Sequence, residues 1–75
     1  MDKTLFIYTD INKTNGAIGI FAHMLTSYGD GDWEDVDYGR KTFHLYDSVD
    51  EAVNAYIEKY VGGIDDKTKI VTKEM

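Results

Sequence analysis

The sequence contains no cysteine and no proline, and it has only one tryptophan among its 75 residues. Without cysteine, the chain can form neither a disulfide nor a cysteine-ligated zinc site, which are common reinforcements of small domains. Its stability must therefore come from a sheet, a helix or a partner subunit. At this length the sequence predicts a single domain over residues 1–75, with a small core.

Basic residues are also scarce, with eight Lys and Arg against fourteen Asp and Glu and a net charge of −6. This balance disfavours direct binding to nucleic acid, because the release of counterions from phosphates supplies most of that affinity. It fits a protein partner with a basic surface. No apolar run approaches the length of a membrane span, and the N-terminus lacks the apolar stretch of a signal peptide. We therefore expect a soluble cytoplasmic protein that does not bind membranes.

The first third of the sequence predicts a β-hairpin. Two β-rich runs, residues 4–11 and 17–25, flank Asn15-Gly16. Asn-Gly is the strongest short-range hairpin signal, because a type I′ turn needs positive φ at both central residues. A two-residue turn at this point would place Tyr8 opposite His23.

Side chains of a strand alternate between the two faces of its sheet, so the hairpin sorts into two faces. The aliphatic face carries Ile7, Ile11, Ile18, Ile20, Ala22 and Met24. The other face is aromatic and half polar, and carries Phe6, Tyr8, Phe21, His23 and Leu25, with Asp10 at its end. We expect the aliphatic face to be the one that the rest of the chain covers.

A helix is predicted to begin after Ser48, because the motif Ser48–Glu51 matches a capping box in which Glu51 reaches back to the cap amide. One apolar stripe follows at helical spacing: Val49, Ala52, Val53, Tyr56, Ile57 and Tyr60. Gly62-Gly63 should end the helix, because glycine accepts the left-handed conformation that follows a helix.

Two more strands are predicted around this helix. Residues 41–46 alternate, with Phe43 and Leu45 on one side and His44 and Tyr46 on the other, and residues 67–73 form a lysine-bordered run suited to a sheet edge. The predicted fold is α+β, an antiparallel sheet of three to four strands with one helix packed on one face, in the order ββ(β)αβ.

The most acidic stretch, residues 26–40, is predicted to be a loop with part of a strand near residues 33–38. It carries five carboxylates: Asp30, Asp32, Glu34, Asp35 and Asp37. A calcium loop starting at Asp30 would need glycine at its sixth position and glutamate at its twelfth, where the sequence has Asp35 and Lys41. The EF-hand pattern therefore fails, and only a weaker cation site stays open.

Two interpretations of the acidic stretch remain. The carboxylates either face solvent, as charge runs usually do, or form a recognition loop with Tyr28, Trp33 and Tyr38 as anchors for a basic partner. In an extended segment, alternate carboxylates lie roughly 6–7 Å apart on one side. That spacing is of the order of the phosphate repeat of a nucleic acid strand, so the stretch could mimic nucleic acid charge.

The aromatic face also has two interpretations. If the single helix covers the aliphatic face, then Phe6, Tyr8, Phe21 and His23 are displayed, joined by His44 and Tyr46 if the third strand pairs with the hairpin. A contiguous aromatic patch usually marks an interface, with the protein's own copy or with another protein. The alternative is that the acidic loop folds back over this face and Trp33 closes a second small core.

The segment from Leu5 to Ala22 resembles the opening hairpin of the ribonuclease H family. In that family an aspartate at the end of the first strand binds a catalytic metal, which implies such a role for Asp10, with Glu51 or Glu58 as a second carboxylate. The glycine that normally follows the aspartate is Ile11 here, and the chain lacks the later elements that carry the remaining acidic residues. Two-metal chemistry then has no scaffold, so a nuclease remnant is our third hypothesis.

In size, acidity and lack of catalytic groups, the chain resembles the small anti-restriction and anti-CRISPR inhibitors of bacteriophages. The resemblance implies a non-catalytic protein that docks on a basic, nucleic-acid-binding surface of a host or rival protein in the host cytoplasm. We predict no cofactor and no metal. The predicted contact residues are Asp30, Asp32, Trp33, Glu34, Asp35, Asp37 and Tyr38, with Phe6, Tyr8, Phe21 and His23 of the aromatic face. The second hypothesis is a homodimeric structural or regulatory module that buries the aromatic face.

Overall fold

The computed structural model describes all 75 residues and confirms an α+β fold with one helix and one four-stranded sheet. Its elements are β1 (Asp2–Ile11), β2 (Ile18–Ser27), β3 (Trp33–Phe43), α1 (Val49–Tyr60) and β4 (Lys69–Glu74). The strand order is β3-β2-β1-β4. The sheet is mixed rather than wholly antiparallel, because β4 runs parallel to β1. A parallel strand needs a crossover connection, and α1 supplies it.

The connection between β1 and β2 differs from the predicted two-residue turn. Six residues, Asn12 to Ala17, separate the strands, and the Asn12 amide donates to the Ala17 carbonyl at 2.8 Å. Gly16 has φ of 74°, but no residue other than glycine has positive φ, which excludes a type I′ turn at Asn15. The register therefore moves by two residues, and Tyr8 lies opposite Phe21 instead of His23. A shift of two residues keeps every side chain on its predicted face.

The strand predicted near residues 33–38 is part of β3, and most of the surrounding stretch predicted to be a loop is also strand. β2 continues to Ser27 and β3 begins at Trp33, so the loop contains only Tyr28–Asp32. β3 is continuous except for a bulge opposite Ala22 and His23. At the bulge Gly39 has φ of 80°, and its amide donates to the Asp37 carboxylate at 2.8 Å. Pairing along the whole of β2 stabilises a segment whose aspartates and glycines are poor strand formers by themselves.

α1 begins as predicted, because the Ser48 hydroxyl accepts the Glu51 amide at 3.2 Å. The second hydrogen bond of the predicted capping box differs by one residue. The Glu51 carboxylate accepts the amide of Asp47, at 3.3 Å, rather than that of Ser48. The helix ends through an extended Val61, and the left-handed glycine is Gly63, with φ of 75°. The glycines therefore turn the chain away from the helix without forming the predicted cap directly after it.

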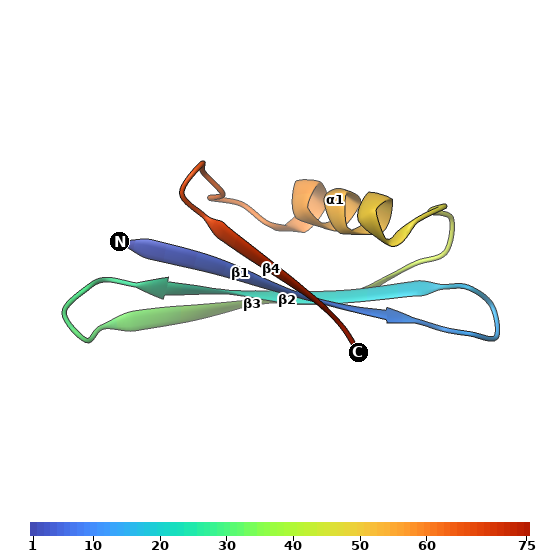
Figure 1. Cartoon of the computed structure of the whole chain (residues 1–75), viewed down its shortest axis with the longest axis horizontal. Helices are drawn as coiled ribbons and strands as arrows, with labels where there is room; N and C mark the ends of the chain where they lie inside the picture. Colours follow the sequence, from blue (N-terminus) through green and yellow to red (C-terminus); the bar gives the residue numbers. More distant parts are fainter.

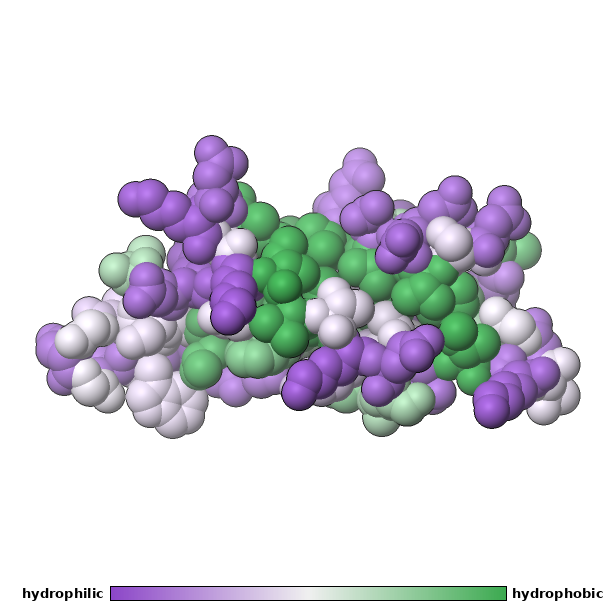
Figure 2. All heavy atoms as spheres, viewed as in Figure 1, coloured by the Kyte–Doolittle hydropathy of each residue, from purple (hydrophilic) through white to green (hydrophobic).

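The core lies between α1 and the aliphatic face of the sheet (Figures 1 and 2). Its buried members are Leu5, Ile7, Ile18, Ile20, Ala22, Met24, Phe43, Ala52, Val53 and Tyr56. β3 ends at Phe43, so the predicted strand over residues 41–46 extends three residues too far. Leu45 is 94 % exposed, and the Tyr46 ring packs edge-on against Phe43 at 5.2 Å. Tyr46 thus joins the core side, not the aromatic face as predicted.

Candidate protein-binding surfaces

The face of the sheet opposite α1 carries a patch of stacked rings, which we call the open face: Phe6, Tyr8, Phe21 and His23. Ring centroids lie 4.7 Å apart for Tyr8 and Phe21, and 5.1 Å apart for Phe6 and His23, with nearly parallel planes. All four side chains are half-buried, and no element covers them in Figure 1. The prediction that the helix leaves this face uncovered is confirmed, and the acidic stretch does not fold over it.

The open face has charges of opposite sign along its two sides. The pairing register places Asp35 and Asp37 of β3 beside Leu25 and His23 of β2. On the other side, Lys69 and Lys73 of β4 lie beside Thr4 and Tyr8 of β1. Paired residues point to the same face of a sheet, so the rings lie between an acidic side on β3 and a basic side on β4. Arg40, beside Phe21, is the one basic residue on the acidic side.

Both acidic residues beside the rings also make local contacts. The Asp35 carboxylate lies 2.7 Å from Nδ1 of His23, which links β3 to the ring stack. The Asp37 carboxylate accepts the amide of Gly39 at the bulge. The first contact holds Asp35 against β2, and the second orients Asp37 at the bulge within β3.

The second surface is the end of the β2–β3 hairpin, residues 28–34, which we call the acidic tip. Its loop is closed by the Tyr28 amide, which donates to the Asp32 carbonyl at 2.9 Å, and it turns at two glycines with φ of 91°. Trp33 is 67 % exposed and Tyr28 48 %. In Figure 1 the tip extends beyond the end of α1, and in Figure 2 it is largely hydrophilic.

The carboxylates of the acidic tip are not neutralised within the chain. The structure has only two ion pairs, His23 with Asp35 and Arg40 with Asp10, so Asp30, Asp32 and Glu34 have none. No Lys or Arg occurs between residues 28 and 38. The tip therefore combines exposed apolar rings with uncompensated negative charge.

The predicted contact residues divide between these two surfaces. Asp35 and Asp37 join the open face, whereas Asp30, Asp32, Trp33 and Glu34 belong to the tip. Tyr38 is an exception, because its partly buried ring packs against the core. We therefore assign Tyr38 to the core instead of to a contact surface.

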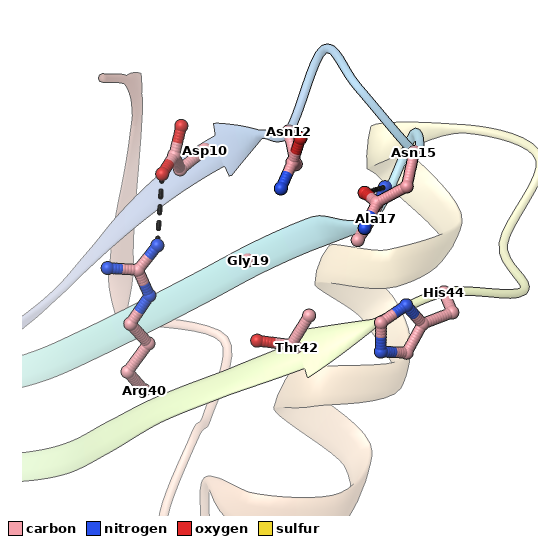
Figure 3. A pocket seen from close by; sticks show the side chains of 8 residues that line it. All are labelled: Asp10, Asn12, Asn15, Ala17, Gly19, Arg40, Thr42 and His44. Carbon is pink, nitrogen blue, oxygen red and sulfur yellow. Dashed lines mark hydrogen bonds and ion pairs between the residues drawn. The ribbon is translucent and has the colours of Figure 1, made fainter.

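A polar hollow at the far end of the sheet was missed by sequence reasoning (Figure 3). There the Arg40 guanidinium of β3 reaches across β2 to the Asp10 carboxylate of β1 at 2.9 Å. It passes over Gly19, where a Cβ atom would lie 3.1 Å from Nη2 of Arg40. A glycine inside a strand often marks such a close approach, and that was the available signal.

The nuclease hypothesis required Asp10 to meet a carboxylate of the helix. Asp10 pairs with Gly19 on the open-face side of the sheet, whereas α1 packs on the opposite face against residues such as Ile7 and Ile20. Asp10 and the helical Glu51 and Glu58 therefore lie on opposite sides of the sheet. No group of three or more His, Asp or Glu side chains is arranged to hold a metal ion.

Tyr56 anchors α1 to the sheet beside the bulge. Its side chain is fully buried, and its hydroxyl donates to the Gly39 carbonyl at 2.6 Å. Burial raises the pKa of this hydroxyl above its ordinary value of 10.0, and a hydrogen bond from the Ala22 amide partly offsets that rise. The bulge that orients Asp37 is thus tied to the helix.

No protein-family model, curated protein or solved structure matches this chain. The one helix is too short and too polar to cross a membrane. Function is therefore inferred from the open face and the acidic tip.

Proposed function

We propose that this chain is a non-catalytic binding protein that docks on a basic, nucleic-acid-binding surface of another protein in the cytoplasm. The observation that carries the proposal is the acidic tip. Three carboxylates without ion-pair partners surround an exposed tryptophan at a point that α1 leaves uncovered. Such carboxylates steer a basic partner, and a tryptophan inserted into a pocket is a frequent source of binding energy.

The arrangement of the carboxylates suits a compact contact with a folded protein better than it suits an extended mimic of a phosphate backbone. Only Asp35 and Asp37 alternate on one side of β3, and Arg40 follows them in the same direction. Both carboxylates also have contacts within the chain. The chain would therefore compete with nucleic acid by placing its compact, charged tip on the basic surface of the partner. An inhibitor of anti-restriction or anti-CRISPR type would act in this way.

The test compares two variants with equal change in net charge. The tip variant carries Asp30→Asn, Asp32→Asn and Glu34→Gln. The control variant also loses three negative charges, at exposed sites elsewhere: Glu58→Gln, Asp66→Asn and Glu74→Gln. Wild type and both variants are immobilised and exposed to the heparin-binding proteins of a lysate from the organism that carries the gene.

We expect wild type and control to retain the same protein, the tip variant to lose it, and duplex DNA to displace it. Retention should fall as salt rises from about 0.05 to 0.5 M, because exposed charges are screened beyond about 10 Å at 0.1 M. Trp33→Ala should weaken binding to the purified partner by at least about tenfold, as for an interface hot spot. Equal retention by the tip variant, or no specific retention at low salt, would contradict the proposal.

A further inference from the structure

We infer that the open face is the interface of a homodimer, in which two copies pack sheet against sheet through Phe6, Tyr8, Phe21 and His23. This inference does not depend on the proposed function, because it uses none of the unpaired carboxylates of the acidic tip. It begins from the rings, which stack on one another across β1 and β2 and have no covering element.

The open face is large enough for a specific interface. Strands of ten, ten, eleven and six residues, at about 3.3 Å per residue and about 4.8 Å between strands, define a face of roughly 600 Å². Specific interfaces begin at about 600 Å² for each partner. A chain of this length also gains limited stability from one core alone, and this chain has no disulfide to reinforce it. Burial of the second face would supply the missing apolar contact.

The charges beside the rings identify the occupant as a second copy. A two-fold axis parallel to the strands, running between β1 and β2, places β3 of one copy over β4 of the other. The acidic side of each copy then meets the basic side of its partner. Thr4, Leu25, Asp35 and Lys69 form one row across the sheet. Asp35 therefore faces Lys69 of the second copy, and this contact occurs twice.

The neighbouring rows add no second pair of opposite charges, because Asp37 lies opposite Val71 of the second copy. Arg40 and Lys73 share a row with Tyr8 and Phe21, so Arg40 would approach Lys73 of the second copy. The Arg40 guanidinium is already paired with Asp10 at 2.9 Å, which reduces the repulsion. A two-fold axis along the strands also keeps both acidic tips at the same end of the dimer. Two tips side by side would bind a partner bivalently, if the tip acts as proposed.

Charge exchange tests this geometry. Asp35→Lys places a lysine side chain against Lys69 of the second copy, whereas Lys69→Glu places a glutamate against Asp35. Each variant alone should raise the dimer dissociation constant at least about tenfold, because like charges then face each other in both contacts. An equimolar mixture of the two variants should restore the dimer, since opposite charges again meet at both contacts. Asp66→Lys and Lys67→Glu, both in the exposed loop before β4, are the matched controls.

Oligomeric state is measured by size-exclusion chromatography with light scattering, and folding by far-ultraviolet circular dichroism. We expect wild type and controls at twice the chain mass of 8.5 kDa, each variant alone closer to the monomer, and the mixture at the dimer. A monomeric wild type at about 0.5 mM, dimers of both variants with unchanged affinity, or a mixture that stays monomeric would overturn the inference.

A second measurement needs no variant. A zero-length carbodiimide reagent joins carboxylates to amines in direct contact, so it should join Asp35 to Lys69 across the dimer. Within one chain these residues are separated by three strand spacings, about 14 Å, which such a reagent cannot bridge. Mixing ¹⁵N-labelled and unlabelled chains should give cross-linked peptides of mixed label. Absence of this cross-link in a dimeric sample would show that a different face forms the interface.

Discussion

The Tyr56 hydroxyl offers a sharp test of how α1 is attached to the sheet. Tyr56→Phe removes one oxygen atom from a fully buried site and keeps the ring that packs against the core. The Gly39 carbonyl at the bulge then loses its donor, which lies at 2.6 Å. Loss of one partner of a buried hydrogen bond costs about 1–3 kcal/mol. A loss of about 2 kcal/mol lowers the melting temperature of a domain of this size by roughly 8–16 °C.

The pH dependence separates the hydroxyl from the ring. Burial raises the pKa of Tyr56 in the folded state. The stability contributed by its protonated hydroxyl is therefore fully present below pH 10 and is lost as pH rises through the folded-state pKa. The Phe variant lacks this titration, so the difference in melting temperature between the two proteins should narrow above pH 10. The other five tyrosines occur in both proteins and cancel in the difference.

Thermal unfolding is followed by circular dichroism at one fixed protein concentration, since association would itself shift the melting temperature. Tyr60→Phe is the matched control, because Tyr60 is exposed and its hydroxyl makes no hydrogen bond. It should melt within about 4 °C of wild type, as expected for a surface change of up to about 0.5 kcal/mol. If Tyr56→Phe melts as high as this control, the hydroxyl does not hold the helix to the bulge.

Three further predictions concern other local contacts. Ser48→Ala removes the helix cap and should lower the free energy of unfolding by about 1 kcal/mol in urea titrations, whereas Ser48→Asp should retain it. Gly19→Ala places a methyl group 3.1 Å from the Arg40 guanidinium, and should displace its side-chain NMR resonances at a cost of at most about 1 kcal/mol. A hydrogen bond from the Lys67 amide lowers the pKa of Asp65. The stability contributed by the Asp65 carboxylate is therefore present above pH 3.8 and is lost as pH falls through the folded-state pKa. Asp65→Asn should therefore show a weaker acid dependence of stability.

The fold class and the two faces of the hairpin could be predicted because they depend on local patterns. The alternation of side chains survives a register error of two residues, so the ring patch was identified although the turn was not. Asn15-Gly16 misled the register because the Asn15 side chain accepts the Ala17 amide at 2.9 Å. This contact lets Asn15 turn the chain without the positive φ that a type I′ turn requires.

The remaining features depend on contacts between distant residues. β3 is a strand because β2 offers a complete pairing edge, which the aspartates and glycines of the segment do not reveal. The parallel direction of β4 follows from the crossover through α1 and from its pairing with β1 rather than with β3. The Asp10–Arg40 pair spans two strands and 30 residues, so no short motif indicates it. The basic side of the open face was missed for the same reason, because Lys69 and Lys73 are placed by that pairing.

The two neighbours of β1 leave the ribosome at very different times. β2 follows after six residues, and a hairpin of this kind closes in about 1–10 μs. β4 pairs Lys69 with Thr4, so the other edge of β1 stays unprotected until residues 69–74 have been synthesised. The six-residue β4 therefore covers the free edge of β1 only after the other strands have been synthesised. A chain that stops at Thr68 would keep an open edge and should be prone to aggregate during expression.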